Sequence, residues 1–335
     1  MNNKVSVIIP TYKRPTTLKR AIDSALHQSY TNLEVIVVDD NSDGDVFREE
    51  TEKLMSQYGQ NERVVYLKHQ KNQNGAAARN TGILHSSADF IAFLDDDDYF
   101  LPTKVEQQIS KLTVLGPDWG GASCYHIRRY KKYIYKAITI NRKDNGNYLA
   151  EFLSEQVSMP SSTLLVRRSV FDRVGLFDTQ FYRHQDLEFL VRFFRDFKMT
   201  FVEDFQLVMQ VEGFRNFPSA DRALVVKNMF VDKFSADINA LSGDRYKMVV
   251  HRMWLPVVGA FFKESRFKTS IAMYRVKVLP YSASVVKDVL FLLYYYLVGA
   301  VPHFKVLFAK VKNLLFYGKL NKKLKNDLNF LNAQV

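Results

Sequence analysis

The chain has 335 residues, of which 47% are hydrophobic and 24% charged, a composition typical of globular proteins with a substantial core. A single cysteine, Cys124, excludes an internal disulfide framework and fits a reducing compartment. Because no apolar run reaches the length of a bilayer and the N-terminus lacks signal-peptide features, we expect neither a membrane-spanning helix nor a secretory leader.

The formal net charge of +12 is unevenly distributed along the chain. Residues 1–240 contain 31 Lys and Arg against 31 Asp and Glu, whereas residues 241–335 contain 16 against 4. The whole excess of positive charge therefore lies in the C-terminal segment. This division predicts two parts of the chain with different partners.

The first hundred residues alternate between strand-like and helix-like segments. Apolar runs of strand composition occur at residues 4–10, 33–38, 64–67 and 90–94. Apolar residues at helical spacing predict an amphipathic helix at residues 16–28, and further helices are expected near 45–58, 75–86 and 104–112. Further along, we expect a loop at 117–121, strands or a hairpin at 125–140 and a strand at 161–166. The alternation predicts an α/β domain with a largely parallel sheet between two layers of helices.

Polar clusters follow three of the predicted strands directly: Pro10-Thr11, Asp39-Asp40 and Asp95 to Asp98. Ligands of parallel sheets bind outside the carboxyl ends of the strands, so these clusters predict a binding site. Four adjacent carboxylates repel one another, and a hard divalent cation such as Mg²⁺ or Mn²⁺ would relieve that repulsion. A solvated acidic turn without a ligand is the alternative interpretation.

The sequence lacks the glycine-rich loops that hold phosphate groups in two large enzyme classes. No GxGxxG follows the first strand and no GxxxxGK[ST] occurs anywhere, which argues against a dinucleotide dehydrogenase and a P-loop NTPase. A phosphate-bearing ligand would therefore be held by a metal ion and basic side chains.

A later helix is predicted from the helical spacing of Leu187, Leu190, Val191 and Phe194. This helix places Asp186 in its first turn, where the macrodipole favours an ionised carboxylate at neutral pH. A helix-start carboxylate with no further role is the alternative. His184, beside it, is either a metal ligand or an ordinary packed or solvent-facing histidine.

Taken together, these motifs resemble those of family 2 glycosyltransferases, which are inverting enzymes with the GT-A nucleotide-binding fold. Four segments carry the resemblance: residues 5–14 (VSVIIPTYKR), 38–43 (VDDNSD), 74–82 (NGAAARNTG) and 93–98 (FLDDDD) with Pro102. A fifth segment, residues 165–188, resembles the acceptor half of the family. There Gln185 stands where the family carries the Glu of a Glu-Asp pair, and Asp186 keeps the matching position.

The resemblance spans roughly residues 4–220 and implies a GT-A-like mixed sheet flanked by helices. We expect a catalytic domain at 1–220, with a nucleotide-binding half at about 1–115 and an acceptor half at about 116–220. A helical, basic region would follow at 221–335. The processive members carry a QxxRW motif, and the nearest string here, HRMW at 251–254, departs from it. The resemblance therefore implies addition of a single sugar.

The resemblance also implies a role for individual residues. Asp97 would bind Mn²⁺ or Mg²⁺, and Asp186 would act as the general base toward an acceptor hydroxyl. Gln185 would contact the acceptor, and Glu188 would orient either the acceptor or the backbone. The residues expected to bind a nucleotide sugar, a UDP-sugar, are Pro10, Thr11, Tyr12, Arg14, Asp40, Asn74, Arg79, Asp95, Asp96, Arg215 and Ser219. Among these, Asp40 would contact the base, while Asp95 and Asp96 would lie near the ribose and diphosphate.

Two other functions remain open on the sequence. In one class of phosphatase a DxD motif also follows a strand, although Asp98-Tyr99 departs from the Thr or Val expected there. A non-catalytic module that binds nucleotide or glycan is the second alternative, and Gln185 is the residue that favours it.

The composition of the basic C-terminal region predicts contact with a membrane. Residues 289–301 form an uncharged, aromatic-rich run that is too short to span a bilayer. The lysines that flank or follow it are Lys287, Lys305, Lys310, Lys312, Lys319, Lys322, Lys323 and Lys325. Such helices lie in the membrane interface and are attracted to anionic lipid. Packing on the catalytic domain or on a second subunit is the alternative, and no nucleic-acid module accompanies the charge. We therefore expect a cytoplasmic protein at the inner face of the cell membrane, acting on a glycan or lipid-linked glycan.

Overall fold

The computed structural model describes residues 3–130, 133–138, 146–153, 157, 159–210 and 219–300. The described residues belong to two compact units. The first unit is drawn from Met1–Asn147 and Met159–Phe214, and the second from Tyr148–Ser158 and Arg215–Tyr317. The expected domain boundaries at 115 and 220 stay predictions.

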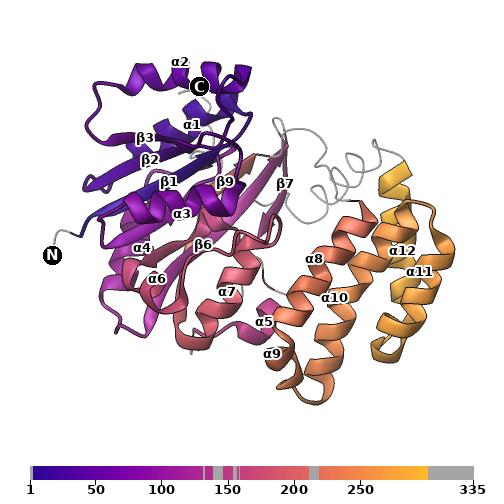
Figure 1. Ribbon diagram of the computed structural model, residues 1–335. Helices are drawn as coiled ribbons and strands as arrows, with labels where there is room; N and C mark the ends of the chain where they lie inside the picture. Colours follow the sequence, from indigo (N-terminus) through magenta and orange to yellow (C-terminus); the bar gives the residue numbers. More distant parts are fainter. Residues whose placement is uncertain are drawn as a thin grey trace. The chain divides into compact units, whose positions relative to one another are not determined.

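The N-terminal half of the first unit is a parallel sheet, as the sequence predicted. Its strands are β1 (Val5–Thr11), β2 (Leu33–Asp39), β3 (Val64–Lys68) and β4 (Phe90–Phe93). Figure 1 shows β3, β2 and β1 side by side. The full order is β3-β2-β1-β4, with Val5 of β1 beside Leu33 of β2 and Phe90 of β4. The order reverses at β1, which is the position where ligands bind to such sheets.

The remaining strands make the sheet mixed. They are β5 (Asp98–Phe100), β6 (Trp119–Tyr130), β7 (Tyr133–Ile138), β8 (Leu165–Arg167) and β9 (Lys198–Gln210). The order continues from β4 through β8, β6 and β9 to β5, while β7 pairs with β6. Strand β8 runs antiparallel to β4 and β6, and β5 runs antiparallel to β9. The prediction of a loop at 117–121 is wrong for residues 119–121, because β6 begins at Trp119 and pairs there with β9.

Helices cover both faces of the sheet. They are α1 (Pro15–Leu26), α2 (Val46–Met55), α3 (Gly75–His85), α4 (Lys104–Thr113), α6 (Arg168–Val174) and α7 (Gln185–Asp196). On one face, Val7 of β1 packs in a buried cluster with Leu18 of α1 and Val105 of α4. On the other face, Phe93 of β4 contacts the rings of Phe171 and Phe177. These two layers place the carboxyl ends of β1, β2 and β4 at one edge of a rigid sheet.

Gly82 allows α3 to lie directly on β1. A Cβ atom at Gly82 would come within 2.5 Å of Ile8 Cγ2, which is closer than carbon atoms can approach. We therefore expect Gly82→Ala to lower the free energy of unfolding by about 1–3 kcal/mol through overpacking. This loss should exceed the gain from the higher helix propensity of alanine. The midpoint of urea unfolding measures this change.

Gly59→Ala is the matched control, because the nearest atom to its added Cβ is Ser56 O at 3.4 Å, an ordinary contact. An unfolding midpoint for Gly82→Ala equal to that of Gly59→Ala would contradict the close packing of α3 on β1.

The second unit is helical over its described residues. It contains α5 (Leu149–Leu153), α8 (Ala220–Lys233), α9 (Ser235–Asn239), α10 (Gly243–Lys263), α11 (Phe267–Met273) and α12 (Val285–Ala300). A π-helical turn, Tyr274–Val278, and a 3₁₀ turn, Leu279–Tyr281, lie between α11 and α12. No helix among the described residues combines the length and the hydropathy needed to cross a membrane. The lysines expected to contact lipid from Lys305 to Lys325 lie outside the described residues.

Candidate functional site

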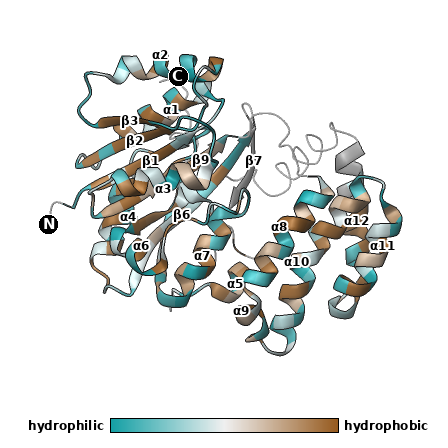
Figure 2. Ribbon diagram, viewed as in Figure 1, coloured by the Kyte–Doolittle hydropathy of each residue, from teal (hydrophilic) through white to brown (hydrophobic). Residues whose placement is uncertain are grey.

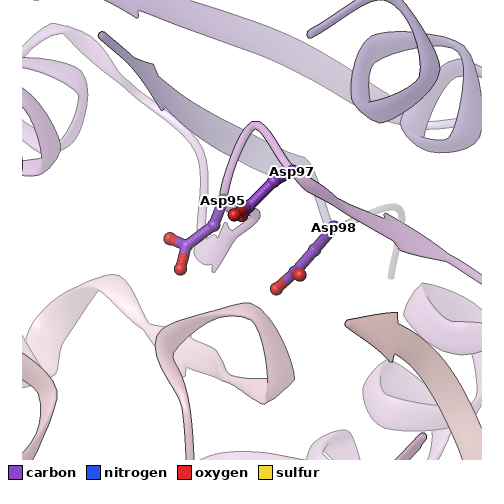
Figure 3. Close-up of side chains that lie close together, drawn as sticks. All are labelled: Asp95, Asp97 and Asp98. Atoms are coloured by element: carbon purple, nitrogen blue, oxygen red, sulfur yellow. The ribbon is translucent and has the colours of Figure 1, made fainter. Parts of the chain in front are cut away.

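An acidic loop joins β4 to β5 at the carboxyl edge of the sheet. Asp95, Asp97 and Asp98 each offer a carboxylate oxygen, and these oxygens lie within 4.8 Å of one another (Figure 3). Asp98 is buried and the other two are partly exposed. Three carboxylates at this spacing form the oxygen-only ligand set that Mg²⁺ and Mn²⁺ prefer, so the residues fit the cation that the sequence predicted. Sequence analysis assigned Asp97 alone as a ligand, and the structure brings Asp95 and Asp98 beside it as further candidates.

Two serines from a distant part of the chain hold the acidic loop. Ser162 Oγ donates to Asp98 Oδ2 at 2.8 Å and accepts from the backbone N–H of Asp95 at 3.0 Å. Ser161 Oγ lies 3.3 Å from Asp95 Oδ1. Both serines belong to a 3₁₀ turn, Ser161–Thr163, just before β8. Sequence analysis placed these residues in a strand and did not predict their role, because nothing local to them indicates the acidic partner.

Asp96 points toward the end of β1 and differs from its neighbours. It is 4% exposed, and it accepts hydrogen bonds from Thr11 Oγ1 at 2.8 Å and from the backbone N–H of Tyr12 at 3.3 Å. Burial raises the pKa of Asp96 to about 7, although the nearby guanidinium of Arg14 acts in the opposite direction. Asp96 therefore fixes the segment after β1, which carries the residues predicted to line a nucleotide pocket. Pro10, near the end of β1, is partly exposed, and Tyr12, directly after the strand, is 42% exposed.

Arginines offset the mutual repulsion of the carboxylates. Arg14 Nη1 lies 2.7 Å from Asp97 Oδ2 and 3.3 Å from Asp96 Oδ1. Arg20 Nη2 donates to the backbone carbonyl of Asp97 at 3.0 Å. The guanidinium of Arg14 is half-exposed, so it can move without breaking the core.

Asp40 is buried in a network of hydrogen bonds at the end of β2. Its Oδ1 lies 2.7 Å from His69 Nδ1 and accepts from the backbone N–H of Gln73 at 2.8 Å. Its Oδ2 accepts from Asn72 Nδ2 at 2.7 Å and from the backbone N–H of Asn74 at 2.9 Å. Both oxygens thus already shape the loop that leads into α3, and the contact predicted between Asp40 and a nucleotide base stays a prediction. Sequence analysis did not identify His69.

Helix α3 starts at this loop and carries Arg79 into the site. Asn74 caps the helix, accepting hydrogen bonds from the backbone N–H groups of Ala76 and Ala77, and its φ of +82° places it in the left-handed region. One turn further, Arg79 Nη2 donates to Asp95 Oδ1, and Nη1 donates to Gln185 Oε1 at 2.9 Å. Arg79 therefore connects the acidic loop to the first residue of α7.

Asp186 lies in the first turn of α7, as the sequence predicted, and its side chain is partly exposed. Its Oδ1 accepts from the backbone N–H of Leu187 at 2.9 Å. Burial raises the pKa of Asp186 above the ordinary range of aspartate, while His184 and Arg79 pull it down. The helix-start argument predicted an ionised carboxylate from the macrodipole alone. The structure shows that burial shifts the pKa the opposite way.

Glu188, two residues after Asp186 in the same helical turn, is completely buried. Both its oxygens accept from Arg192, with Nε at 2.6 Å and Nη2 at 2.8 Å, and Arg192 also donates to the carbonyls of Val174 and Leu176. Of the two roles predicted for Glu188, orienting an acceptor or orienting backbone, this geometry favours the second.

We expect Glu188→Ala to lower the free energy of unfolding by about 3–5 kcal/mol, because it leaves the Arg192 guanidinium without its buried counter-ion. Thermal unfolding measures the loss. Asp196→Ala is the control: Asp196 pairs with Arg173, whose side chain is 65% exposed, so removing this pair should cost less than about 1 kcal/mol. A raised KM for acceptor with unchanged stability would instead assign Glu188 to acceptor binding.

Two predicted residues lie away from this network. Arg215 falls outside the described residues. Ser219 belongs to the second unit, where its hydroxyl caps α8 by accepting from the backbone N–H of Arg222 at 3.3 Å. Their roles toward a nucleotide sugar stay predictions.

Comparisons with known protein sequences identify the family. Residues 6–175 match the model of Glycosyl transferase family 2. An uncharacterized glycosyltransferase of Rickettsia prowazekii is 25% identical over 307 residues, which cover 86% of this chain and 90% of that protein. The Escherichia coli UDP-Glc:alpha-D-GlcNAc-diphosphoundecaprenol beta-1,3-glucosyltransferase WfgD is 36% identical over 108 residues, which cover 32% of this chain and 40% of that protein.

Solved structures share the fold. S. aureus TarS 1–349 in complex with UDP-GlcNAc matches with a TM-score of 0.55 and 16% identity, covering 81% of this chain and 83% of that one. The mannosyltransferase PcManGT from Pyrobaculum calidifontis, in complex with GDP-Man and Mn²⁺, matches with a TM-score of 0.54 and 18% identity. That match covers 93% of this chain and 87% of the other. These likenesses confirm the predicted GT-A-like mixed α/β fold. Since the family model covers half of the chain, the chain belongs to glycosyl transferase family 2 and is an enzyme that transfers sugars.

Proposed function

We propose that the enzyme transfers one sugar from a UDP-sugar to a hydroxyl group of a glycan or lipid-linked glycan, with inversion and with the help of a divalent cation. One observation carries the proposal: Arg79 contacts both Asp95 of the acidic loop and Gln185, the neighbour of Asp186. A candidate cation-binding cluster and a candidate base thus lie in one network within the first unit. The UDP-GlcNAc bound by TarS and the UDP-Glc in the name of WfgD support the choice of donor.

On the donor side, Asp95, Asp97 and Asp98 would hold the cation. Mn²⁺ or Mg²⁺ bound there would stabilise the negative charge that develops on the departing nucleoside diphosphate. The chain itself contributes positive charge through Arg79 and the half-exposed Arg14, whose guanidinium groups suit phosphate oxygens. The segment fixed by Asp96 and the turn fixed by Asp40 would form the nucleotide pocket.

On the acceptor side, Asp186 would take the proton of the attacking hydroxyl group. The acceptor oxygen then forms a bond to the anomeric carbon on the face opposite the diphosphate, and the bond from that carbon to the diphosphate oxygen breaks. This in-line displacement inverts the configuration. A general base must be accessible to its substrate and must accept the proton as charge develops, and the partly exposed Asp186 meets the first condition.

Gln185 does not by itself favour a non-catalytic module. Its Oε1 accepts a hydrogen bond from Arg79 at 2.9 Å, a contact that the carboxylate of a glutamate could also make. Gln185 therefore makes a contact with Arg79 while placing no negative charge beside Asp186.

A thermal-shift screen of nucleotide sugars tests the proposal, because a ligand that binds only the folded state raises the unfolding temperature. We expect one UDP-sugar to raise it more with Mn²⁺ than with EDTA, and to release UDP slowly in the absence of acceptor. Phosphate release without nucleotide dependence would instead indicate the phosphatase alternative. Binding of UDP-sugar without turnover in the presence of a range of glycan acceptors would favour the binding module.

We also place the enzyme on the cytoplasmic side of the cell membrane, in peripheral contact with it through the C-terminal region. The charge of residues 241–335 supports this placement. Association of the chain with itself stays a prediction.

A further inference from the structure

The second unit exposes a row of large apolar side chains on α12. Val286, Leu290 and Leu293 are 70%, 60% and 45% exposed, and their spacing of four and three residues places them on one face of the helix. Figure 2 shows hydrophobic residues recurring along α12. Further exposed apolar residues in the same segment are Phe267, Ile271, Val276, Leu279, Val285 and Val289. We call the exposed side chains of residues 267–293 the α11–α12 surface.

This surface contains an apolar recess of about 200 Å³. Its walls include Phe262 and Ile271 on one side and Val289, Leu292 and Leu293 of α12 on the other. The recess and the exposed row share Leu293 and Val289, so they form one continuous apolar feature. A contiguous apolar patch of this kind on a globular protein marks an interaction site.

The charge around the surface has one sign. Among residues 267–293, all of which the structure describes, the exposed charged residues are Lys268, Arg275, Lys277 and Lys287. Arg266, just before this range, pairs with Asp221 at 2.7 Å and is not counted with them. The single acidic residue in that range, Asp288, is 3% exposed. Asp288 accepts from Tyr274 Oη at 3.0 Å and from Ser282 Oγ, and it lies 2.9 Å from His251 Nε2. Its charge is therefore held inside the unit and does not offset the surface lysines.

We propose that the α11–α12 surface binds an anionic lipid bilayer, with Val286, Leu290 and Leu293 entering the boundary between headgroups and acyl chains. Apolar side chains interleaved with lysine and arginine are the combination that such an interface takes. A second copy of this chain is a poorer occupant, because a two-fold contact would oppose the same basic residues to each other. The inference rests only on the membrane placement in the proposed function, and the sugar-transfer chemistry plays no part in it.

Flotation of the full chain with vesicles tests the proposal. We expect binding to phosphatidylcholine vesicles that contain phosphatidylglycerol and much weaker binding to phosphatidylcholine alone. Leu290→Ser should weaken binding to the anionic vesicles about tenfold, since it removes most of the apolar side chain that Leu290 would bury in the bilayer. Lys277→Gln and Lys287→Gln should each weaken it about fivefold. Added salt should release the wild type only in part, because screening acts on charges and not on inserted apolar area.

Leu84→Ser and Val114→Ser are the matched controls, because these residues are 68% and 82% exposed but lie in the first unit. Both should bind vesicles like the wild type. The temperature of thermal unfolding, measured for every variant, shows that each is folded, and because it needs no nucleotide it separates this test from that of the sugar-transfer proposal. Equal binding to both vesicle types, or no binding, would overturn the proposal. So would loss of a concentration-dependent dimer in Leu290→Ser without any effect on vesicles, which would assign the surface to a contact between copies.

Discussion

Asp186→Asn is expected to lower the rate of sugar transfer by about 10²- to 10⁴-fold, the range that a positioned general base contributes. The substitution keeps the shape of the side chain and its acceptor oxygen for the N–H of Leu187, but the amide cannot take a proton from the acceptor. UDP binding should change by less than about twofold, because the base acts on the acceptor and not on the donor. Transfer is measured with the donor identified by the screen, and UDP binding by calorimetry.

The acid limb of the wild-type pH profile gives a second readout for Asp186. Burial raises the pKa of this carboxyl, so the active ionised form is lost as the pH falls through a value above the ordinary range of aspartate. The limb should disappear in Asp186→Asn. Asp172→Asn, an exposed aspartate on α6, is the control and should behave like the wild type. Equal transfer by Asp186→Asn and wild type would show that another group is the base.

Asp97→Ala is expected to abolish the part of UDP affinity that depends on a cation. Changes to residues that only support a metal ligand cost about 10- to 100-fold in metal affinity, so loss of a ligand should cost at least as much. A weaker affinity that does not depend on a cation should remain, supplied by Asp40 and Arg79. Titration of UDP into wild type and variant, each with Mn²⁺ and with EDTA, separates the two parts.

Two comparisons sharpen this experiment. Asp172→Ala removes the same charge from an exposed position on α6, so it reports any general effect of net charge on UDP binding. Asp98→Ala should also lose the cation-dependent part, but with a lower unfolding temperature, because Asp98 is buried and bonded to Ser162. If wild type binds UDP equally in Mn²⁺ and in EDTA, the loop is an acidic turn without a ligand.

Much of the donor side of the fold could be predicted because its signals are local. The segments that form β1, β2 and β4 are short, largely apolar and free of glycine, and helical spacing of apolar residues indicated α1 and α7. The polar residues at the strand ends followed from this pattern together with the rule that parallel strands end at one edge. The clustering of Asp95 and Asp97 could be predicted because they belong to a run of four consecutive aspartates.

The remaining features depend on contacts between distant parts of the chain. Ser162 supports Asp98 across 64 residues, and His69 supports Asp40 across 29, and no local pattern marks either partner. The pKa of Asp186 depends on how deeply α7 is buried, which the position of the residue in its helix does not reveal. Strand β6 begins at Trp119, inside the loop predicted at 117–121, because Trp119 pairs with Lys198 of β9.

The pairing of β5 has a consequence for synthesis of the chain on the ribosome. In the described sheet β5, which begins at Asp98, has β9 as its partner, and β9 begins only at Lys198. Roughly a hundred residues must therefore be added after the acidic loop before the strand that follows it can pair. At the usual elongation rate of about 5–20 residues per second, this is a delay of about 5 to 20 seconds. The acidic loop therefore acquires its last partner strand only after β1, β2, β3 and β4, which pair with one another, have all been synthesised.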